Sequence, residues 1–224
     1  MANFTHAIST VSTANATSYT TGAFTPAAGD LLVAIVEASN TTSVGEASSS
    51  TGGTFTRISG TSFDGTNITL LFVANFFASA VSQTFTWICP DDAATGTVIH
   101  IARLSGMSLY GASAVRQVGG NAGLSSDTPA VTLGTAVLTG NPTIGGFGNL
   151  SNPAGVTPPS GWTERSDTGY ATPTTGSEYV TRDSGFTGTT ITWGSSSATS
   201  WAALAAEFDS SGTGGTAGNF FLFF

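Results

Sequence analysis

Short apolar runs separated by polar, glycine-rich segments recur along the whole chain and predict β-strands. The run Leu31–Val36 is continuously apolar, which is typical of a strand covered on both faces. Residues 39–53 are rich in Ser, Thr, Gly and Asn and predict a loop. Further strands are predicted at Thr54–Ser59, Ile68–Phe77, Gln83–Ile88, Thr97–Leu104, Val131–Leu138 and Thr143–Phe147, and at about 162–167, 177–183, 189–193 and 199–208. Roughly ten to twelve short strands with Gly and Pro turns are typical of a sandwich or barrel.

The two halves of the chain repeat one pattern of strands. The offset between matching segments falls only from 108 to 104 residues. The matching pairs are 53–57 with 161–165, 71–73 with 178–180, 84–87 with 190–193, and 99–104 with 203–208. Such internal similarity is the signature of a duplicated unit.

The strand pattern and the repeat together predict an all-β protein, a jelly-roll-like β-sandwich built from two duplicated halves of about five strands. We expect the sandwich to span residues 23–208, with copies at about 23–104 and 130–208. Residues 1–22 are expected to form an N-terminal arm or an edge strand. Residues 105–129 are expected to be a crossover or an exposed excursion.

The C-terminal residues 209–224 depart from the repeat. A stretch of linker composition, residues 210–218, precedes an uncharged apolar segment. Such a segment either folds back as the last strand of its own sandwich or adds to the sheet of a neighbouring chain. The candidate docking residues are Phe220, Phe221, Leu222, Phe223 and Phe224.

The charge pattern narrows the classes of partner. The chain has no lysine, only five arginines, and a net charge of −8. Nucleic-acid binding requires a basic surface that replaces counterions, so we expect no nucleic-acid partner. An anionic membrane surface is excluded as a partner by the same reasoning. The first residues lack the basic and apolar parts of a secretory signal, and no run approaches the length of a membrane span.

The sequence offers few groups for catalysis. His6 lies in the expected arm, and His100 lies within a strand, where a half-exposed or hydrogen-bonded side chain is expected. Neither histidine has a second histidine at metal-ligand spacing. Cys89 ends a strand and is expected to be a small buried thiol. We expect no enzyme, no cofactor and no metal.

Two carboxylate pairs have the residue types needed for glycoside hydrolysis, Glu164 with Asp167 and Glu178 with Asp183. Solvated acids on strands and turns are the expected interpretation of both pairs. Asp91-Asp92 follows Pro90 and predicts a turn, and without a calcium-loop pattern it gives little support for calcium.

The tryptophans divide into two kinds. Trp87 and Trp193 occupy matching repeat positions and are expected to pack in the core or at an interface. Trp162 follows a Pro-rich loop, so an alternative to packing is stacking on the sugar ring of a glycan.

Three segments resemble tailed-phage and prophage structural proteins. They are Thr25–Ala34, the Pro-Ser-Gly-Trp-Thr of 159–163, and Trp201–Phe208, so that the resemblance spans about 24–208. Members of that group are β-sandwich head-decoration, minor capsid or tail-associated proteins. The resemblance implies a role carried by surfaces, with no catalytic residue to transfer.

The expected function is therefore a non-enzymatic structural component of a phage particle, made in the host cytoplasm and located in the virion. Capsid decoration, or a minor capsid or tail position, fits best. The expected partners are further copies of the chain in a homo-oligomer, with a trimer as one option, and a major capsid or tail protein. The alternative is a carbohydrate-binding adhesion module, and a weaker one is an extracellular fibre subunit.

Overall fold

The computed structural model describes residues 1–89, 94–124, 128–150, 156–194 and 200–210, and it confirms the predicted all-β sandwich. The first half contains β1 (Asn3–Ser12), β2 (Ser18–Thr20), β3 (Leu31–Ser39), β4 (Glu46–Ser49), β5 (Thr54–Phe63), β6 (Asn67–Phe77), β7 (Phe85–Ile88) and β8 (Gly96–Ser105). The second half contains a short 3-10 turn, η1 (Gly111–Ala114), and then β9 (Val115–Gly123), β10 (Ala130–Thr132), β11 (Thr143–Asn149), β12 (Thr163–Ala171), β13 (Thr174–Arg182), β14 (Thr190–Thr192) and β15 (Trp201–Phe208). Among the described residues, no helix is long and apolar enough to cross a membrane.

The strands of the first half form one curled antiparallel sheet in the order β1-β8-β3-β6-β5-β4-β7-β2. Its two ends fold toward each other, so that β1-β8-β3-β6 faces β2-β7-β4-β5. Two facing four-stranded groups connected in this way form an eight-stranded jelly roll. The large rings of Phe72, Phe85 and Trp87 are buried between the two groups.

The second half repeats this strand order. Its main sheet runs β9-β15-β11-β13-β12, and β10 pairs with β14 in a small separate sheet. If β9 is matched with β1, the remaining strands follow in the same relation: β15 with β8, β11 with β3, β13 with β6, and β12 with β5. The pair β10-β14 then corresponds to β2-β7. The two halves therefore share one topology as well as one sequence pattern.

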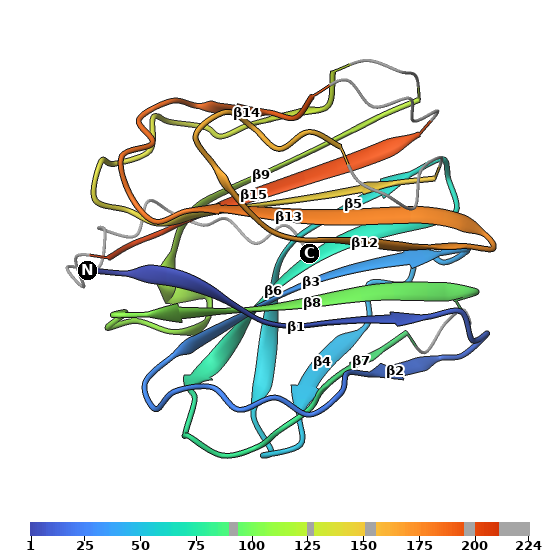
Figure 1. Cartoon of the computed structure of the whole chain (residues 1–224), viewed down its shortest axis with the longest axis horizontal. Coiled ribbons are helices and arrows are strands. Elements are labelled where there is room, and N and C mark those ends of the chain that lie inside the picture. Colours follow the sequence, from blue (N-terminus) through green and yellow to red (C-terminus); the bar gives the residue numbers. More distant parts are fainter. Residues whose placement is uncertain (90–93, 125–127, 151–155, 195–199, 211–224) are drawn as a thin grey trace, which may run out of the picture.

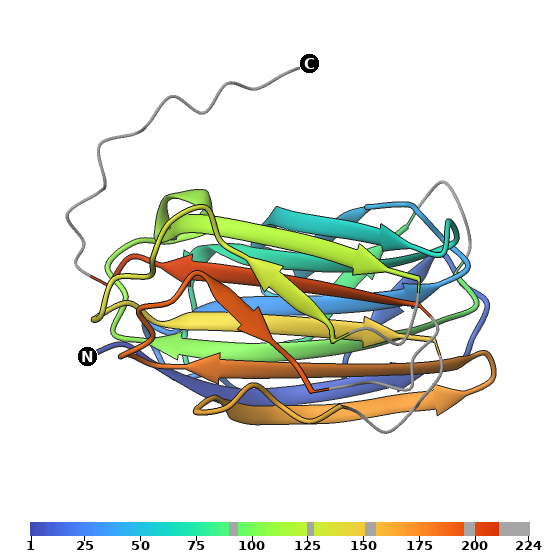
Figure 2. The same ribbon diagram turned by 90° about the horizontal axis from the view of Figure 1, so that it is seen from above.

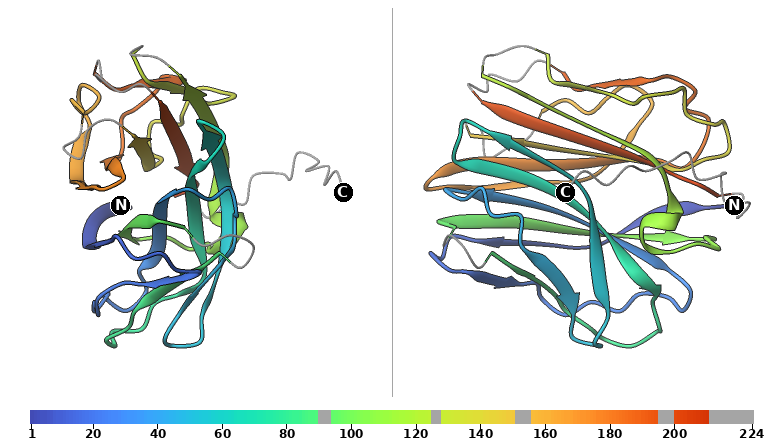
Figure 3. Two further views of the ribbon diagram at one scale, coloured as in Figure 1. Left: turned by 90° about the vertical axis from the view of Figure 1, so that its right-hand side faces the viewer. Right: turned by 180° about the vertical axis from the view of Figure 1, so that it is seen from behind.

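The two copies stack face to face, with the first copy below and the second above in Figure 1 and in the left view of Figure 3. The five-stranded layers meet in the middle, while the short strands cover their outer faces. Strand β1 lies beside β12 at one margin, and β5 lies beside β9 at the other (Figure 2). Because β1 matches β9 and β12 matches β5, each margin joins the same two kinds of strand. The two copies are therefore related by an approximate twofold axis.

Burial on both faces explains the composition of the central strands. Every residue of β3, β11 and β15 is buried, as the continuous apolar run at Leu31–Val36 predicts. Two glycines of β11 let the copies approach closely. A Cβ atom at Gly146 would lie 3.1 Å from the side chain of Ile35, and one at Gly148 would lie 2.7 Å from that of Glu37.

The structure differs from the sequence-based expectation in two segments. Residues 105–129 were expected to form a crossover or an exposed excursion, but Val115–Gly123 forms β9, the first strand of the second copy. Residues 39–53 were expected to form a loop, but Glu46–Ser49 forms β4. Both strands are poor in large apolar residues, which is why their pattern is typical of a loop.

Both ends of the described chain lie at the same end of the sandwich. The expected arm or edge strand at residues 1–22 contains β1 and β2, and β1 pairs with β8. The ring of Phe4 on β1 packs edge-on against Phe208 at the end of β15, with ring centroids 5.8 Å apart. The predicted docking residues Phe220, Phe221, Leu222, Phe223 and Phe224 lie outside the described residues.

Candidate functional site

A row of polar side chains joins the two copies along their contact. The Phe4 N–H donates to Asp183 Oδ1 at 2.7 Å. His6 Nδ1 and the Tyr179 hydroxyl are 2.7 Å apart, and so are the hydroxyls of Ser9 and Ser166. Farther along, Ser39 Oγ bonds the Tyr170 hydroxyl at 2.6 Å and the Thr175 hydroxyl at 2.9 Å. The partners lie on opposite copies, so these bonds fix the register of the stack.

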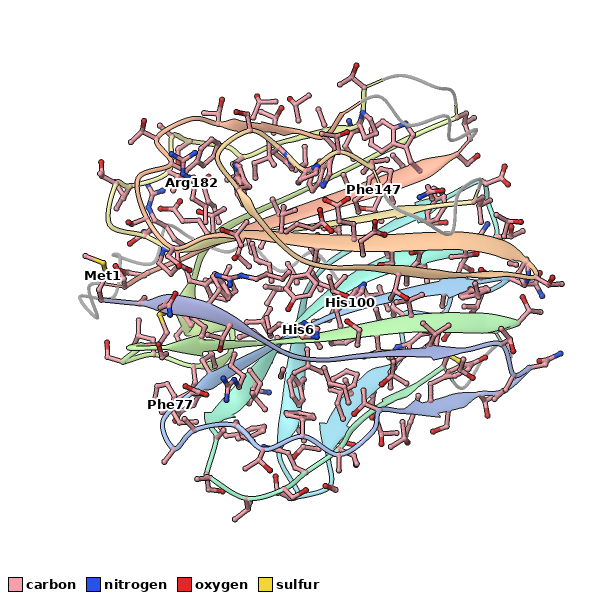
Figure 4. All side chains as sticks on the ribbon, viewed as in Figure 1. Met1, His6, Phe77, His100, Phe147 and Arg182 are labelled. Atoms are coloured by element: carbon pink, nitrogen blue, oxygen red, sulfur yellow. The ribbon has the colours of Figure 1, made fainter. Side chains whose placement is uncertain are left out.

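His100 lies at the centre of this contact, between the layers in Figure 4. Its Nδ1 is 2.7 Å from Ser9 Oγ, and its Nε2 is 3.0 Å from Ser177 Oγ on the other copy. The side chain is hydrogen-bonded, as one of the two expectations had it, but it is buried and not half-exposed. Burial, with a contribution from nearby His6, lowers the pKa of His100 to about 3, so the ring is neutral at physiological pH.

Glu37 is a buried carboxyl on β3, close to the same contact. Burial raises the pKa of Glu37 well above its usual value, and only the neighbouring Ser177 hydroxyl favours the charged form. Neither carboxyl oxygen has a hydrogen-bond partner of normal geometry among the described residues. The sequence signal for this site is a lone acid that follows directly on the apolar run Leu31–Val36.

The carboxylate pairs expected from the sequence are only partly brought together. Asp167 and Glu178 are directly opposite on β12 and β13 and share the outer face of the layer. Burial, with the charges of Glu164 and Asp167, raises the pKa of Glu178 to about 8, and its Oε2 accepts the Val156 N–H at 3.2 Å. Asp183 instead lies at the contact with β1 and also pairs with Arg165 at 3.8 Å.

The tryptophans at matching repeat positions are core residues, as predicted. Trp87 stacks on Tyr19, and Trp193 stacks on Phe147, with each tryptophan fully buried inside its own copy. Cys89 is likewise buried, in agreement with the expected small thiol. Asp91 and Asp92, considered above for calcium, lie outside the described residues.

Trp162 is half-buried against Phe186, edge to face, with ring centroids 5.3 Å apart. The guanidinium of Arg182 lies over the ring of Phe186, 5.8 Å from its centroid. These contacts explain Trp162 as packing at the surface of the second copy. A glycan would have to use the ring surface that Phe186 leaves uncovered.

Replacing Trp162 with alanine is expected to lower the free energy of unfolding by about 1–2 kcal/mol, because a half-buried ring and its aromatic pair are lost. Urea unfolding measures this change. The exposed Val118, replaced with alanine, provides a control that is expected to change stability by less than about 0.5 kcal/mol. Equal stability of Trp162→Ala and the wild type would contradict the packing role.

A wedge-shaped hollow opens on the first copy, where β4 and β5 diverge. Strand β4 pairs with β5 only through Ala47 and Ser48, and beyond that point residues 42–46 separate from β5. The gap between these residues and β5 contains two adjoining hollows of about 420 and 270 Å³. We call this hollow the β4–β5 wedge. Arg57 lines both hollows, and Glu46 lines the smaller one. The remaining lining is part apolar and part polar, and includes Val44, Ala47, Phe55, Ile58 and Ile68 together with Thr42, Ser59 and Ser62.

Arg57 is the distinctive group of the wedge. It is exposed, and alone among the five arginines it forms no hydrogen bond or ion pair with the described residues. No sequence signal distinguished it from the other arginines, because the wedge forms only where the two strands diverge in space.

The described residues contain no group of three or more His, Cys, Asp or Glu side chains arranged to hold a metal ion. The two kinds of site that the structure does present are therefore the sealed polar contact between the copies and the open wedge around Arg57. Compared with models of protein families and with curated proteins, the chain matches none.

Proposed function

We propose that the protein is a non-enzymatic structural component of a phage particle, located in the virion as a capsid decoration protein or as a minor capsid or tail protein. It assembles through the surfaces of its sandwich and through its terminal segments. The resemblance at Thr25–Ala34, 159–163 and Trp201–Phe208 supports this role. The surface chemistry also supports it, because a lysine-free chain associates through shape, apolar contact and backbone pairing.

The observation that carries the proposal is the firm anchor from which the apolar C-terminal segment continues. The Asp209 N–H donates to the Ala114 carbonyl at 2.9 Å. Ser210 Oγ bonds the Gly140 carbonyl at 2.9 Å and Asn141 Oδ1 at 3.1 Å. Asp209 and Ser210, the last described residues, are therefore held on the body of the sandwich. A rigid body that carries a tethered apolar peptide is suited to bind a neighbour in an assembly.

The first test compares the native mass of the full chain with that of a tail-serine variant, in which Phe220, Phe221, Leu222, Phe223 and Phe224 are all replaced by serine. We expect the wild type to form a homo-oligomer and the variant to be a monomer, because the apolar contacts that join one chain to another are lost. Mass photometry measures both. Chain length is equal in the two proteins, so the difference reports side-chain chemistry alone. An unchanged oligomer in the variant would refute assembly through this segment.

The second arm addresses the particle. Purified protein is mixed with assembled shells or tubes of candidate capsid and tail proteins, and co-sedimentation is measured. Saturable binding at a fixed stoichiometry supports the proposed position in a virion. Failure to bind any such assembly, together with glycan-array binding that is lost in Trp162→Ala, would instead favour the carbohydrate-binding alternative.

A further inference from the structure

The β4–β5 wedge brings charged, hydroxyl and apolar groups together in one hollow. Arg57 supplies a positive charge and Glu46 a negative one. Thr42 and Ser62 supply hydroxyls, and apolar side chains such as Val44 complete the lining. A ligand that fits this hollow must offer hydrogen-bond acceptors, hydrogen-bond donors and an apolar face within a small volume.

The polar side chains of the wedge have unused hydrogen-bonding capacity. With the described residues Arg57 forms no hydrogen bond or ion pair, and neither do the side chains of Thr42, Glu46 and Ser62. Exposed hydroxyls elsewhere on the first copy do find partners, as Thr20 does with Thr86 at 2.9 Å. The wedge therefore gathers donors and acceptors that the rest of the described chain leaves available for a ligand.

The outer wall of the wedge is the extended segment 42–46, which is held by β7. Trp87 Nε1 donates to the Val44 carbonyl at 3.3 Å. Gly45 has a positive φ of 55°, and a Cβ atom there would collide with the Ile88 carbonyl. The bend that carries this segment away from β5 is thus fixed by its contacts with β7, so the hollow is formed before any ligand arrives.

The alternation of exposed and buried residues turns one side of this segment toward the hollow. Thr42, Val44 and Glu46 are exposed and line the wedge, whereas Thr41 and Ser43 between them are buried. The larger hollow, of about 420 Å³, falls within the range of small-molecule clefts, about 300–1,000 Å³.

The mixed lining disfavours the simplest ligands. A small anion would be attracted by Arg57 but repelled by Glu46 in the same hollow, and a small cation would meet the opposite pair of effects. A purely apolar ligand would remove two charged groups and two hydroxyls from water without replacing their hydrogen bonds. The remaining class is a neutral ligand that carries both donors and acceptors.

We propose that the β4–β5 wedge binds a saccharide. Each sugar hydroxyl both donates and accepts hydrogen bonds. Neighbouring hydroxyls of one ring can therefore accept from the Arg57 guanidinium and donate to the Glu46 carboxylate, and both bonds are charge-assisted. The C–H face of the ring packs against Val44 and Ile58. The inference goes beyond the proposed role in a particle and does not depend on it.

The wedge is separate from the surface around Trp162. It lies on the first copy, between β4 and β5, whereas Trp162 packs against Phe186 on the second copy. Substitutions at the two places therefore distinguish a saccharide bound in the wedge from one stacked on the tryptophan.

The first measurement follows the arginine side chains of the full-length protein by nuclear magnetic resonance. The chain has five arginines and no lysine, so the Nε–H region holds few signals, and Arg57→Lys identifies that of Arg57. Glucose, galactose, N-acetylglucosamine and glucuronic acid are titrated separately, and a glycan array extends the set to oligosaccharides. We expect a saccharide to shift the Arg57 signal saturably and to leave the other four in place. No binding on the array and no shift at Arg57 would overturn the proposal.

Substitutions then test the site with the best ligand of the array. Arg57→Ala is expected to weaken binding by about 10-fold or more, because a charge-assisted hydrogen bond is lost. Ser62→Phe places a ring in the hollow and is expected to block binding, whereas Ser82→Phe, at an exposed serine outside the wedge, is the matched control. Circular dichroism melts check that each variant is folded. Unchanged binding in folded Arg57→Ala and Ser62→Phe would show that the saccharide binds elsewhere.

Two further arms separate the alternatives. If inorganic phosphate or acetate shifts the Arg57 signal and no saccharide does, the wedge is an anion site and the saccharide proposal is wrong. If glycan binding is lost in Trp162→Ala but kept in Arg57→Ala, the glycan site lies on the second copy. Neither result affects the tests of oligomer mass and particle binding, so the proposed function stands or falls separately.

Discussion

Replacing Glu207 with alanine is expected to lower the free energy of unfolding by about 3–4 kcal/mol, because a buried and fully paired carboxylate is removed. Glu207 Oε2 accepts from Arg116 and from Gln117, both on β9. Glu207 Oε1 accepts from Asn141 Nδ2 at 2.7 Å and from the Leu138 N–H at 3.0 Å. Without the carboxylate these donors lose their acceptor, and the donors that stay buried contribute the larger part of the cost.

The substitution is informative because Glu207 connects three parts of the second copy. It lies on β15, holds the first strand β9 on one side, and fixes the segment around Leu138 and Asn141 on the other. Arg116 is partly exposed, so its ion pair alone would contribute little. The expected loss comes mainly from the hydrogen bonds made by a carboxylate with no exposed surface.

Urea denaturation checks the expected loss through the midpoint at an unchanged slope. Glu207→Gln keeps one acceptor oxygen and is expected to lose less stability than Glu207→Ala. Glu164→Ala, at an exposed position on β12, is the control and is expected to stay within about 0.5 kcal/mol of the wild type. A loss below about 1 kcal/mol for Glu207→Ala would mean that the donors find water on relaxation.

The sequence predicts the layers of this fold better than their margins. The strands β3 and β15 are buried on both faces, so their apolar runs are visible without any structural information. The repeat also anticipates the buried positions of Trp87 and Trp193. These features are predictable because each is a property of a strand and its immediate covering.

Strand β9 could not be recognised, because the reason for its composition lies in other strands. Its Gly119 is needed where a Cβ would lie 2.7 Å from the Thr132 carbonyl. Its Gly120 is needed where a Cβ would lie 2.5 Å from the Thr61 hydroxyl of the first copy. Glycines that allow close packing from both sides give the segment the composition of a loop.

The candidate sites were hidden for a related reason. The wedge exists because β4 and β5 diverge after two paired positions, and the charge of Arg57 acquires meaning only beside that gap. The contact between the copies brings His100 of β8 to Ser177 of β13 across 77 positions of sequence. No local pattern encodes such a meeting, although the lone Glu37 inside an apolar run is the kind of residue that marks one.

The second large effect is a loss of stability in acid that originates at His100. In the unfolded chain the histidine titrates near 6.5, whereas in the folded protein burial holds its pKa at about 3. Between pH 6.5 and 3 the unfolded state therefore binds a proton at this histidine that the folded state does not bind. The stability is fully present above pH 6.5 and is lost as the pH falls toward 3, by about 4–5 kcal/mol for this one group.

The charged groups around His100 modify this loss without reversing it. His6 on β1 also has a lowered pKa, because of burial and the nearby positive charge of Arg165 on β12, so it acts in the same direction. Glu37 on β3 acts in the opposite direction. Its raised pKa means that its contribution is present below about 4.5 and is lost as the pH rises above that value. Tyr179 on β13 has a raised pKa from burial and stays neutral throughout this range.

The measurement is the free energy of unfolding of the wild type, His100→Gln and Glu37→Gln from pH 3 to 8. His100→Gln is expected to be less stable than the wild type at pH 7, because its shorter side chain replaces two hydrogen bonds imperfectly, and to lose less stability on acidification. Glu37→Gln is expected to gain on the wild type as the pH rises above 4.5, because glutamine has no charge to bury.

The two variants separate the contributions of His100 and Glu37 to the dependence of the unfolding free energy on pH. If His100 were accessible to water in the folded protein, wild type and His100→Gln would lose stability in parallel below pH 6.5. The polar contact would then be a hydrated channel between the copies. A shallower acid limb in His100→Gln alone identifies the contact as sealed. The two copies then unfold as one cooperative body in acid, because protonation of His100 destabilises the layer that both of them share.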